Sequence, residues 1–336
     1  ESYIVESTLK YIRFFFYTLV IIFLLSTIKD FKKKLNIIFF FVILTVIFDG
    51  IFQYIFGYNT IGLKQEISYR VSGYFGDELI LGSFISKYLP FFFIFFIINK
   101  KYNFFLLPLL FVILLMSFLT GERTAFFTSI ILSLIVILKF YDLKKILLLI
   151  SSLILILTII IKFDENIKER MINSTIQDTQ ILKNWKNPKS LQIFTNDHNA
   201  HFQSAYLMYK KGDLSAKLFG RGVKSFRLNC SKREFCDNYA EVCCSSHPHN
   251  IFLQTLSEIG LVGLFIYLYF LLYLSYNSIL LFRNKYENKR FIINASILIN
   301  YLPFLPSGNI FGTFISANFF ILLSFLIYLN NQKKSN

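Results

Sequence analysis

The sequence predicts an all-α polytopic membrane protein with about nine transmembrane helices and one long extracytoplasmic loop. Of its 336 residues, 55% are hydrophobic, 42 are Phe, 20 are Tyr and only 16% are charged. A soluble domain carries about 25% charged residues. Uncharged runs such as 104–118 and 146–161 approach the ~20 residues needed to cross a ~30 Å hydrocarbon core. These properties exclude a soluble globular protein.

Apolar runs separated by charge clusters give the expected spans in order. They cover residues 11–28, 35–54, 79–98, 103–119, 124–141, 146–161, 250–281, 291–305 and 310–329. The net charge of +15 is attributed to membrane topology, so nucleic acid is not an expected partner. The chain starts at Glu1 with a run of span length and no signal-peptide pattern. We therefore expect a processed chain or one that lacks upstream spans.

Basic residues also predict the topology. The positive-inside rule places the Lys-rich loop 29–34 in the cytoplasm, so the loop 54–78, the turn 120–123 and the segment 162–249 lie outside. The segment 162–249 holds 14 Lys or Arg against 9 Asp or Glu, which favours an anionic partner. The expected domains are an N-terminal transmembrane bundle (1–161), the long extracytoplasmic loop (162–249) and C-terminal transmembrane helices (250–336).

The cysteines are confined to this outside segment. They are Cys230, Cys236, Cys243 and Cys244. Clustering in an oxidising compartment predicts two disulfides. A bond between the two adjacent cysteines would be strained, which leaves two pairings open. The alternative is a zinc site that also uses His247 and His249, although the spacing lacks the usual C-x2-4-C pair.

The segment His247-Pro248-His249-Asn250 precedes an apolar run and is a candidate site. Asn250 can cap the helix that starts there. A helix N-terminus disfavours imidazolium, so we expect His249 to be neutral and able to accept a proton. The alternative is a helix cap without catalytic function.

The helix that follows contains Glu258, Gly260 and Gly263. At about 100° per residue, both glycines share the face of His249, which predicts a glycine groove beneath the imidazole. Glu258 is expected on the opposite face. A carboxylate at that depth is functional or paired with an Arg. Small-residue packing is the structural alternative.

Three outside turns carry candidate cations. Arg123, in Gly121-Glu122-Arg123-Thr124, suits a bidentate grip on phosphate, with snorkelling as the alternative. Two glycines near Arg70 allow a tight turn that returns it to the membrane. The glycine-bounded turn 220–227 resembles a phosphate-binding nest in composition. The sequence lacks the G-x-x-x-x-G-K-[ST] pattern, so ATP binding is not implied. The outside loops also lack a DxD-like carboxylate pair, which disfavours a metal-dependent nucleotide-sugar transferase.

Together these motifs resemble the O-antigen ligase and O-antigen polymerase superfamily of bacterial membrane enzymes. The superfamily's H-N-x9-G-x-x-G signature is matched by His249-Asn250 followed, after nine residues, by Gly260 and, after two more, by Gly263. The turn around Arg123 is similar to its S-G-x-R-T-A motif. Arg70 and the segment 218–226 are similar to its first outside loop and its G-x-G-x-x-x-F turn.

The resemblance implies a C-class, inverting glycosyltransferase that uses an undecaprenyl-diphosphate-linked glycan and needs no metal or other cofactor. It implies His249 and Arg123 as catalytic residues. The implied diphosphate ligands are Arg70, Arg123 and a cation of the long loop, which is either Arg221 or Arg227, with Lys224 assisting. The implied supporting residues are His201, His247, Asn250, Glu258, Gly260 and Gly263.

We therefore expect a polymerase of O-antigen or other surface polysaccharide in the bacterial inner membrane, with its site facing the periplasm. The alternatives are an O-antigen ligase or protein O-oligosaccharyl ligase with the same donor and, less favoured, a lipid-linked glycan transporter. The expected partners are the lipid-linked donor, a glycan or lipid A-core acceptor, and membrane lipids. A chain-length regulator is a further candidate partner.

Overall fold

The computed structural model describes residues 2–65, 67, 70–179, 195–236, 243–284, 286–303 and 305–334. Regular structure in these residues is helical, apart from two isolated β-bridges, Tyr58 with Lys64 and Asn250 with Pro306. The predicted all-α membrane class is confirmed. The chain forms two compact units, each discontinuous in sequence. Each unit joins helices that are distant in sequence, and the expected division of the sequence into three consecutive segments stays a prediction.

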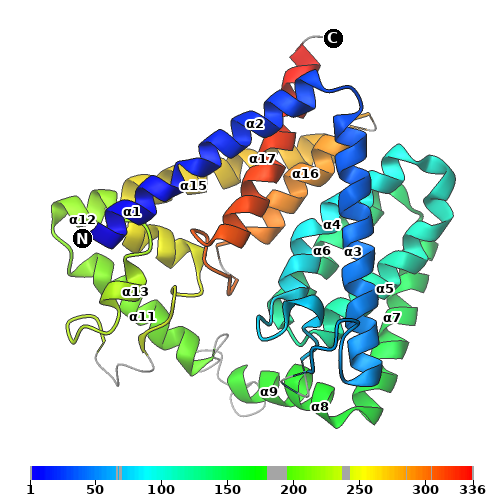
Figure 1. Cartoon of the computed structure of the whole chain (residues 1–336), viewed down its shortest axis with the longest axis horizontal. Coiled ribbons are helices and arrows are strands. Elements are labelled where there is room, and N and C mark those ends of the chain that lie inside the picture. Colours follow the sequence, from blue (N-terminus) through cyan, green and yellow to red (C-terminus); the bar gives the residue numbers. More distant parts are fainter. Residues whose placement is uncertain are drawn as a thin grey trace. The chain divides into compact units, whose positions relative to one another are not determined.

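The first unit comprises residues 1–27, 178–279 and 301–336. Its helices are α1 (Ser2–Tyr11), α2 (Arg13–Thr27), α11 (Asn196–Lys210), α12 (Leu214–Phe219), α13 (Phe226–Asn229), most of α15 (Ile251–Arg283), and α17 (Thr313–Lys334). Helix α2 packs along α17, as Figure 1 shows in blue and red. The short helices α11 to α13 belong to the segment 162–249, for which the basic residues predict an extracytoplasmic location.

The second unit comprises residues 28–177 and 280–300. Its main helices are α3 (Phe31–Phe56), α4 (Leu81–Ile98), α5 (Leu106–Leu119), α6 (Arg123–Phe140), α7 (Leu143–Phe163) and α16 (Asn288–Asn300). The segment after α7 continues as α8 (Glu165–Lys168), the π-turn η3 (Glu169–Asn173) and α9 (Ser174–Thr179), which ends at the unit boundary.

Helix α4 is the core of the second unit and packs against α3, α5, α6 and α16. Its run Phe91–Phe96 is buried throughout, as expected for a helix that is apolar on every side. Pro90 cannot donate the hydrogen bond that would satisfy the Ser86 carbonyl. The Asn300 amide nitrogen donates to that carbonyl instead, at 3.3 Å. This contact ties the end of α16 to the proline site of α4.

Eight helices in the described part of the chain are long and apolar enough to span a membrane. The segment 291–305, expected as a ninth span, differs because its helix α16 has only 13 residues. At 1.5 Å per residue such a helix is about 20 Å long, short of a ~30 Å hydrocarbon core. Its apolar residues are buried against α4 and α6 instead.

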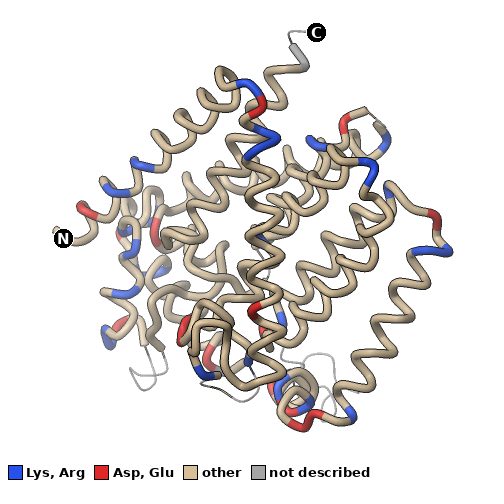
Figure 2. Tube along the Cα trace, turned by 45° about the vertical axis from the view of Figure 1, so that its right-hand side comes forward, with Lys and Arg blue, Asp and Glu red and all other residues tan. Residues whose placement is uncertain are grey.

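The surface of the spans is suited to lipid. Phe23 in α2, Leu148 in α7 and Leu272 in α15 are 63%, 70% and 70% exposed. Figure 2 shows charged residues gathered at helix ends and in connecting segments, with the helix middles largely free of charge. Exposed apolar side chains of this extent require a partner that removes them from water, and a bilayer supplies it.

Candidate functional site

The four histidines of the chain form one cluster in the first unit. The imidazole of His249 lies 4.1 Å from that of His247, 5.2 Å from that of His198 and 5.3 Å from that of His201, measured between ring centroids. His198 and His201 are three residues apart on α11, so they share one face of that helix. Helix α11 thus brings two imidazoles to the segment that precedes α15.

His249 has an unusual backbone conformation, with φ at 56° in the left-handed region. Two contacts hold it there. Its carbonyl accepts a hydrogen bond from the Ser307 amide at 2.9 Å, and the next residue, Asn250, caps α15 by accepting from the Leu253 amide at 3.0 Å. Strained backbone of this kind gathers at functional sites, where the surrounding structure fixes a side chain in place.

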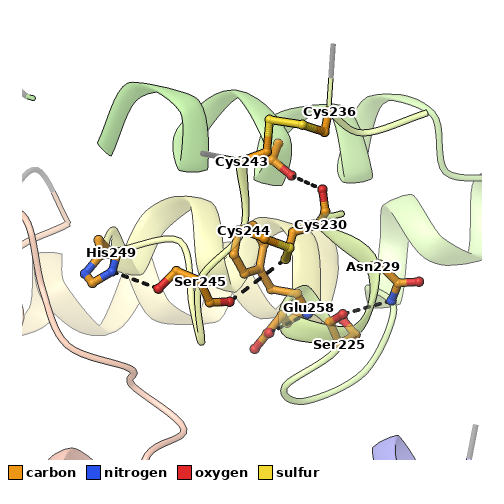
Figure 3. Close-up of a disulfide and its surroundings, with 11 residues drawn as sticks. Ser225, Asn229, Cys230, Cys236, Cys243, Cys244, Ser245, His249 and Glu258 are labelled. Carbon is orange, nitrogen blue, oxygen red and sulfur yellow. Dashed lines mark hydrogen bonds between the residues drawn. A yellow bond between two sulfur atoms is a disulfide. The ribbon is translucent and has the colours of Figure 1, made fainter. Parts of the chain in front are cut away.

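The two central histidines differ in their hydrogen bonds. The Nε2 atom of His247 donates to the Ser307 carbonyl at 3.0 Å, so in the neutral ring Nδ1 accepts from the Ser246 hydroxyl at 2.9 Å. His247 therefore has both nitrogens occupied by structural contacts. His249 has its Nε2 atom 3.1 Å from the Ser245 hydroxyl (Figure 3). Of the two, His249 is the one suited to exchange a proton with a substrate.

Burial sets the charge of this cluster. It lowers the pKa of His249 to about 3 and that of His247 to about 4, and the neighbouring imidazoles contribute in the same direction. Burial also lowers the pKa of His201, partly offset by Asp197 and by a hydrogen bond with the Cys244 backbone. At neutral pH His247 and His249 are therefore uncharged, so His249 is in the form that can accept a proton.

Two disulfides join the residues directly before the His247–His249 segment to the residues that follow α13. They connect Cys230 with Cys244 and Cys236 with Cys243, and no described cysteine is free. The zinc alternative with cysteine ligands is therefore wrong, because all four sulfurs are bonded to each other. Figure 3 shows the Cys230–Cys244 bridge close to Ser245, whose hydroxyl lies beside His249. Cys230 packs among Ala205, Met208, Phe226 and Phe235 in a buried cluster.

Helix α15 is interrupted at Gly260, where φ is 72° and ψ is −170°. The expected glycine groove beneath His249 is therefore wrong, because no continuous helix carries the 100° periodicity to Gly263. The interruption leaves carbonyls of the preceding turn available. The Ser257 carbonyl accepts from the Arg221 amide at 3.2 Å, and the Glu258 carbonyl accepts from the Gly222 amide at 2.8 Å.

Glycine is needed on both sides of this contact. A Cβ atom on Gly260 would overlap the Leu218 carbonyl, and one on Gly220 would overlap the backbone of Glu258. Both glycines also have positive φ, at 72° and 78°. The two spaced glycine motifs of the sequence are thus the two halves of one backbone-to-backbone junction.

The carboxylate of Glu258 is fully buried at this junction. It accepts hydrogen bonds from the Lys224 amide at 3.1 Å, the Phe226 amide at 3.0 Å and the Gln254 side chain at 3.2 Å. Two of the amides expected to form a phosphate-binding nest are therefore bound to a carboxylate of the protein. The expected arginine partner is also replaced, since backbone amides and Gln254 solvate the charge.

The three cations of the turn have different surroundings. Arg221 donates from Nε to the Met208 carbonyl at 3.0 Å, and its guanidinium lies 4.9 Å from the Phe235 ring centroid. It is a structural brace. Arg227 is exposed and donates to the Tyr3 hydroxyl at 3.2 Å. Lys224 has a φ of 63° and lines a cavity beside α1.

In the second unit, the turn before α6 is built around Glu122. Its carboxylate accepts from the Gly82 amide at 2.6 Å, the Ser83 amide at 3.1 Å and the Ser83 hydroxyl at 2.7 Å, and so caps α4. Burial raises the pKa of Glu122, while these hydrogen bonds and the Arg70 charge act against the shift. Lys87, buried in α4, also interacts electrostatically with this carboxylate.

Arg70 and Arg123 lie on either side of this cap. Arg70 donates from Nη2 to the Leu79 carbonyl at 3.0 Å. Arg123, the first residue of α6, donates from Nη1 to the Thr175 hydroxyl at 3.1 Å. A third cation, Arg170, donates from Nε to the Gly121 carbonyl at 3.1 Å. Arginines from three separate segments of the chain thus lie at or next to the turn that contains Glu122.

The loop that carries Arg70 is fixed by two buried polar residues of α3. Asp49 accepts from the Thr60 amide at 2.8 Å, and Gln53 accepts from the Ser72 and Gly73 amides at 2.9 and 2.7 Å. These contacts fold the loop back over the end of α3, which sets the position of Arg70.

Comparison with protein families gives one match. Residues 107–268 match the family model described as O-antigen ligase. Over these residues, which are slightly less than half of the chain, the protein is similar to the O-antigen ligase family, and this supports the resemblance seen in the motifs. Neither curated proteins nor solved structures gave a match. The matched residues extend from α5 across Arg123 and the outside segment to His249 and the junction at Gly260.

The candidate residues of the protein occur in both compact units. Arg70 and Arg123 belong to the second unit, and His249, Lys224 and Arg227 belong to the first. Three polar contributors were not found from the sequence, namely His198, Arg170 and Lys87. The i, i+3 spacing of His198 and His201 was a usable signal, whereas Arg170 carries no motif of its own.

The disulfide pairing gives a direct test of the outside segment. Peptide mapping of the purified protein without reductant should recover Cys230 joined to Cys244 and Cys236 joined to Cys243, with no free thiol. Recovery of Cys230 joined to Cys243 would contradict the structure. Removal of the longer bridge by serine replacement should lower the unfolding free energy by about 2–4 kcal/mol.

Gly260 and Gly263 provide a matched pair of alanine variants. Gly260→Ala should destabilise the protein by at least ~1–2 kcal/mol, because Ala is unfavourable in the left-handed region and its Cβ overlaps the Leu218 carbonyl. Gly263→Ala should destabilise the protein less, because its φ is not positive and its Cβ would displace a side chain, that of Ile259, rather than overlap backbone. Thermal melting of both purified variants measures the difference. Equal losses would show that the junction does not depend on Gly260.

Proposed function

We propose that this protein is a membrane glycosyltransferase that polymerises undecaprenyl-diphosphate-linked oligosaccharide units at the outer face of the inner membrane. The observation that carries the proposal is His249, a neutral imidazole held in a strained conformation within the segment that matches the O-antigen ligase family. Ligase activity with the same donor is the second candidate, favoured by the description of the matching family.

In this reaction the acceptor hydroxyl attacks the anomeric carbon of the donor sugar. A new glycosidic C–O bond forms as the bond to the diphosphate breaks, with inversion at carbon. The hydroxyl proton passes to His249, and the leaving diphosphate keeps the bonding electron pair. General-base help of this kind contributes typically ~10² to 10⁴ in rate.

The leaving diphosphate needs positive charge where its own charge develops. We assign this role to the guanidinium groups of Arg70 and Arg123, with Lys224 and Arg227 as the candidate cations of the long loop. Arg221 is left out of this set because it braces Met208 and Phe235. The negative donor would also raise the pKa of His249 from about 3 towards the working pH, which makes it a more effective base.

The experiment that tests this proposal is transfer by the purified chain, with a glycan on undecaprenyl diphosphate as donor and a chelator present. The expected result is a longer or transferred glycan together with free undecaprenyl diphosphate. Movement of intact donor across a vesicle membrane without cleavage would identify a transporter instead. Activity that requires added divalent metal would contradict the metal-independent chemistry.

Cellular products distinguish polymerase from ligase. Deletion of a polymerase should leave one repeat unit on the surface lipid, because a separate ligase still transfers single units. Deletion of the ligase should leave none. A single-unit product is the result expected here.

Topology is predicted from the basic residues. Reporter fusions after Gly121 and after Ser190 should behave as external, and a fusion after Lys145 should behave as internal. Ser190 lies outside the described residues, whereas the disulfide pair Cys230–Cys244 is on the same expected side. A cytoplasmic signal at Ser190 would contradict the proposed location of the site.

A further inference from the structure

A second cationic feature lies in the first unit, beside the N-terminal helices. A cavity of about 140 Å³ is lined by α1, the start of α2, Lys224 and Phe311. One water occupies roughly 30 Å³ in the liquid, so the cavity has room for a small polyatomic group. Its lining from α1 and α2 lies outside the residues that match the O-antigen ligase family.

The cavity has an excess of positive charge. Its lining includes the cations Lys10, Arg13 and Lys224, and a single carboxylate, that of Glu6. Glu6 forms an ion pair with Lys10, one turn along α1. Arg227 adds a further cation at the edge, since it donates to the Tyr3 hydroxyl that also lines the cavity.

The other side of the cavity is aromatic. Tyr11, Phe14 and Phe311 line it, and the Tyr11 ring packs 5.3 Å from that of Phe14 and 5.4 Å from that of Phe311, measured between centroids. The cavity lies at the charged end of the candidate span Ser2–Thr27, whose remainder is apolar. A cationic group above an aromatic wall at the end of a span suits a ligand with an anionic head and an apolar tail.

We propose that this cavity binds the phosphate headgroup of a membrane lipid through Lys10, Arg13 and Lys224. Arg13 is positioned by a hydrogen bond from Nη2 to the Thr313 hydroxyl at 2.9 Å and lies 4.9 Å from the Phe14 ring centroid. The shared chemistry is a phosphate ester or diphosphate. The source is either the lipid-diphosphate donor or bulk anionic phospholipid.

The test uses the full chain in phosphatidylcholine nanodiscs, titrated with inorganic pyrophosphate. Lys10→Gln with Arg13→Gln should raise the Kd about tenfold or more, because two cations that contact the anion are lost. The matched control, Lys232→Gln with Arg233→Gln, removes the same charges from exposed positions of the same unit and should change the Kd less than about twofold. Lys224→Asn, which tolerates positive φ, should weaken binding independently of α1.

Competition then identifies the source. Displacement of pyrophosphate by added phosphatidylglycerol supports a bulk phospholipid site, and displacement only by undecaprenyl diphosphate supports a donor site. Equal affinity of wild type and the Lys10/Arg13 variant, or an equal loss in the Lys232/Arg233 control, would overturn the proposal. Binding is measured without acceptor or turnover, so inactivity in the transfer assay leaves this test unaffected.

Discussion

His249→Asn should reduce glycan transfer by ~10² to 10⁴ while leaving the fold intact, because it removes the general base. Asparagine tolerates the left-handed backbone that His249 adopts, so the variant does not introduce the strain that alanine would. The measurement is the turnover of purified protein with undecaprenyl-diphosphate-linked glycan at matched folded amounts. Ser245→Ala is the control, since it removes only the hydroxyl beside Nε2 and should have a smaller effect.

The pH dependence of stability tests the same residue. The folded-state pKa of His249 is about 3, whereas an unfolded histidine titrates near ~6.5. Between these values the unfolded state binds more protons, so stability is fully present above pH ~6.5 and falls as the pH is lowered. His249→Asn should have a shallower decline in melting temperature between pH 7.5 and 5 than wild type. If both the slope and the turnover are unchanged in this variant, His249 has no role in proton transfer.

Arg123→Lys should reduce kcat by ~10² to 10³, because lysine keeps the charge but loses the planar two-pronged contact with a phosphate. Melting temperature should change little, since lysine keeps the positive charge and the long side chain at the first position of α6. The measurement is again transfer at matched folded amounts.

Thr175→Val is the matched control for Arg123. It removes the hydroxyl that accepts from the guanidinium and preserves side-chain volume. If Arg123 only ties α9 to the turn, the two variants should lose the same activity. If Arg123 contacts the diphosphate, Thr175→Val should retain most of the turnover. Wild-type rates in Arg123→Lys would remove this residue from the mechanism.

Sequence patterning predicted the membrane class because the signal is local. Long uncharged runs and the lysines between them are sufficient to identify spans, and eight of the expected segments form helices of spanning length. The segment 291–305 is the exception. Its apolar residues predicted a span. In the structure they form a helix of 13 residues whose apolar side chains are buried against α4 and α6, and this burial explains their composition.

Local sequence also indicated two disulfides, while only the tertiary structure decided their pairing. Four clustered cysteines left two arrangements open, and the fold places Cys244 against Cys230 within the cluster around Phe226. In the same way, the spacing of His249 and Gly260 indicated a candidate site, but the glycine groove predicted from that spacing was wrong. A helical projection assumes an uninterrupted helix, and Gly260 ends that regularity.

By itself, then, the sequence determined the helical membrane class, the motif that contains His249 and the presence of oxidised cysteines. The partners of those residues were decided by contacts across long stretches of chain. His198 reaches His249 from α11, and Glu258 occupies the amides of the turn 222–226. Such pairings depend on how helices pack, and no local periodicity encodes which distant backbone amide will meet a buried carboxylate.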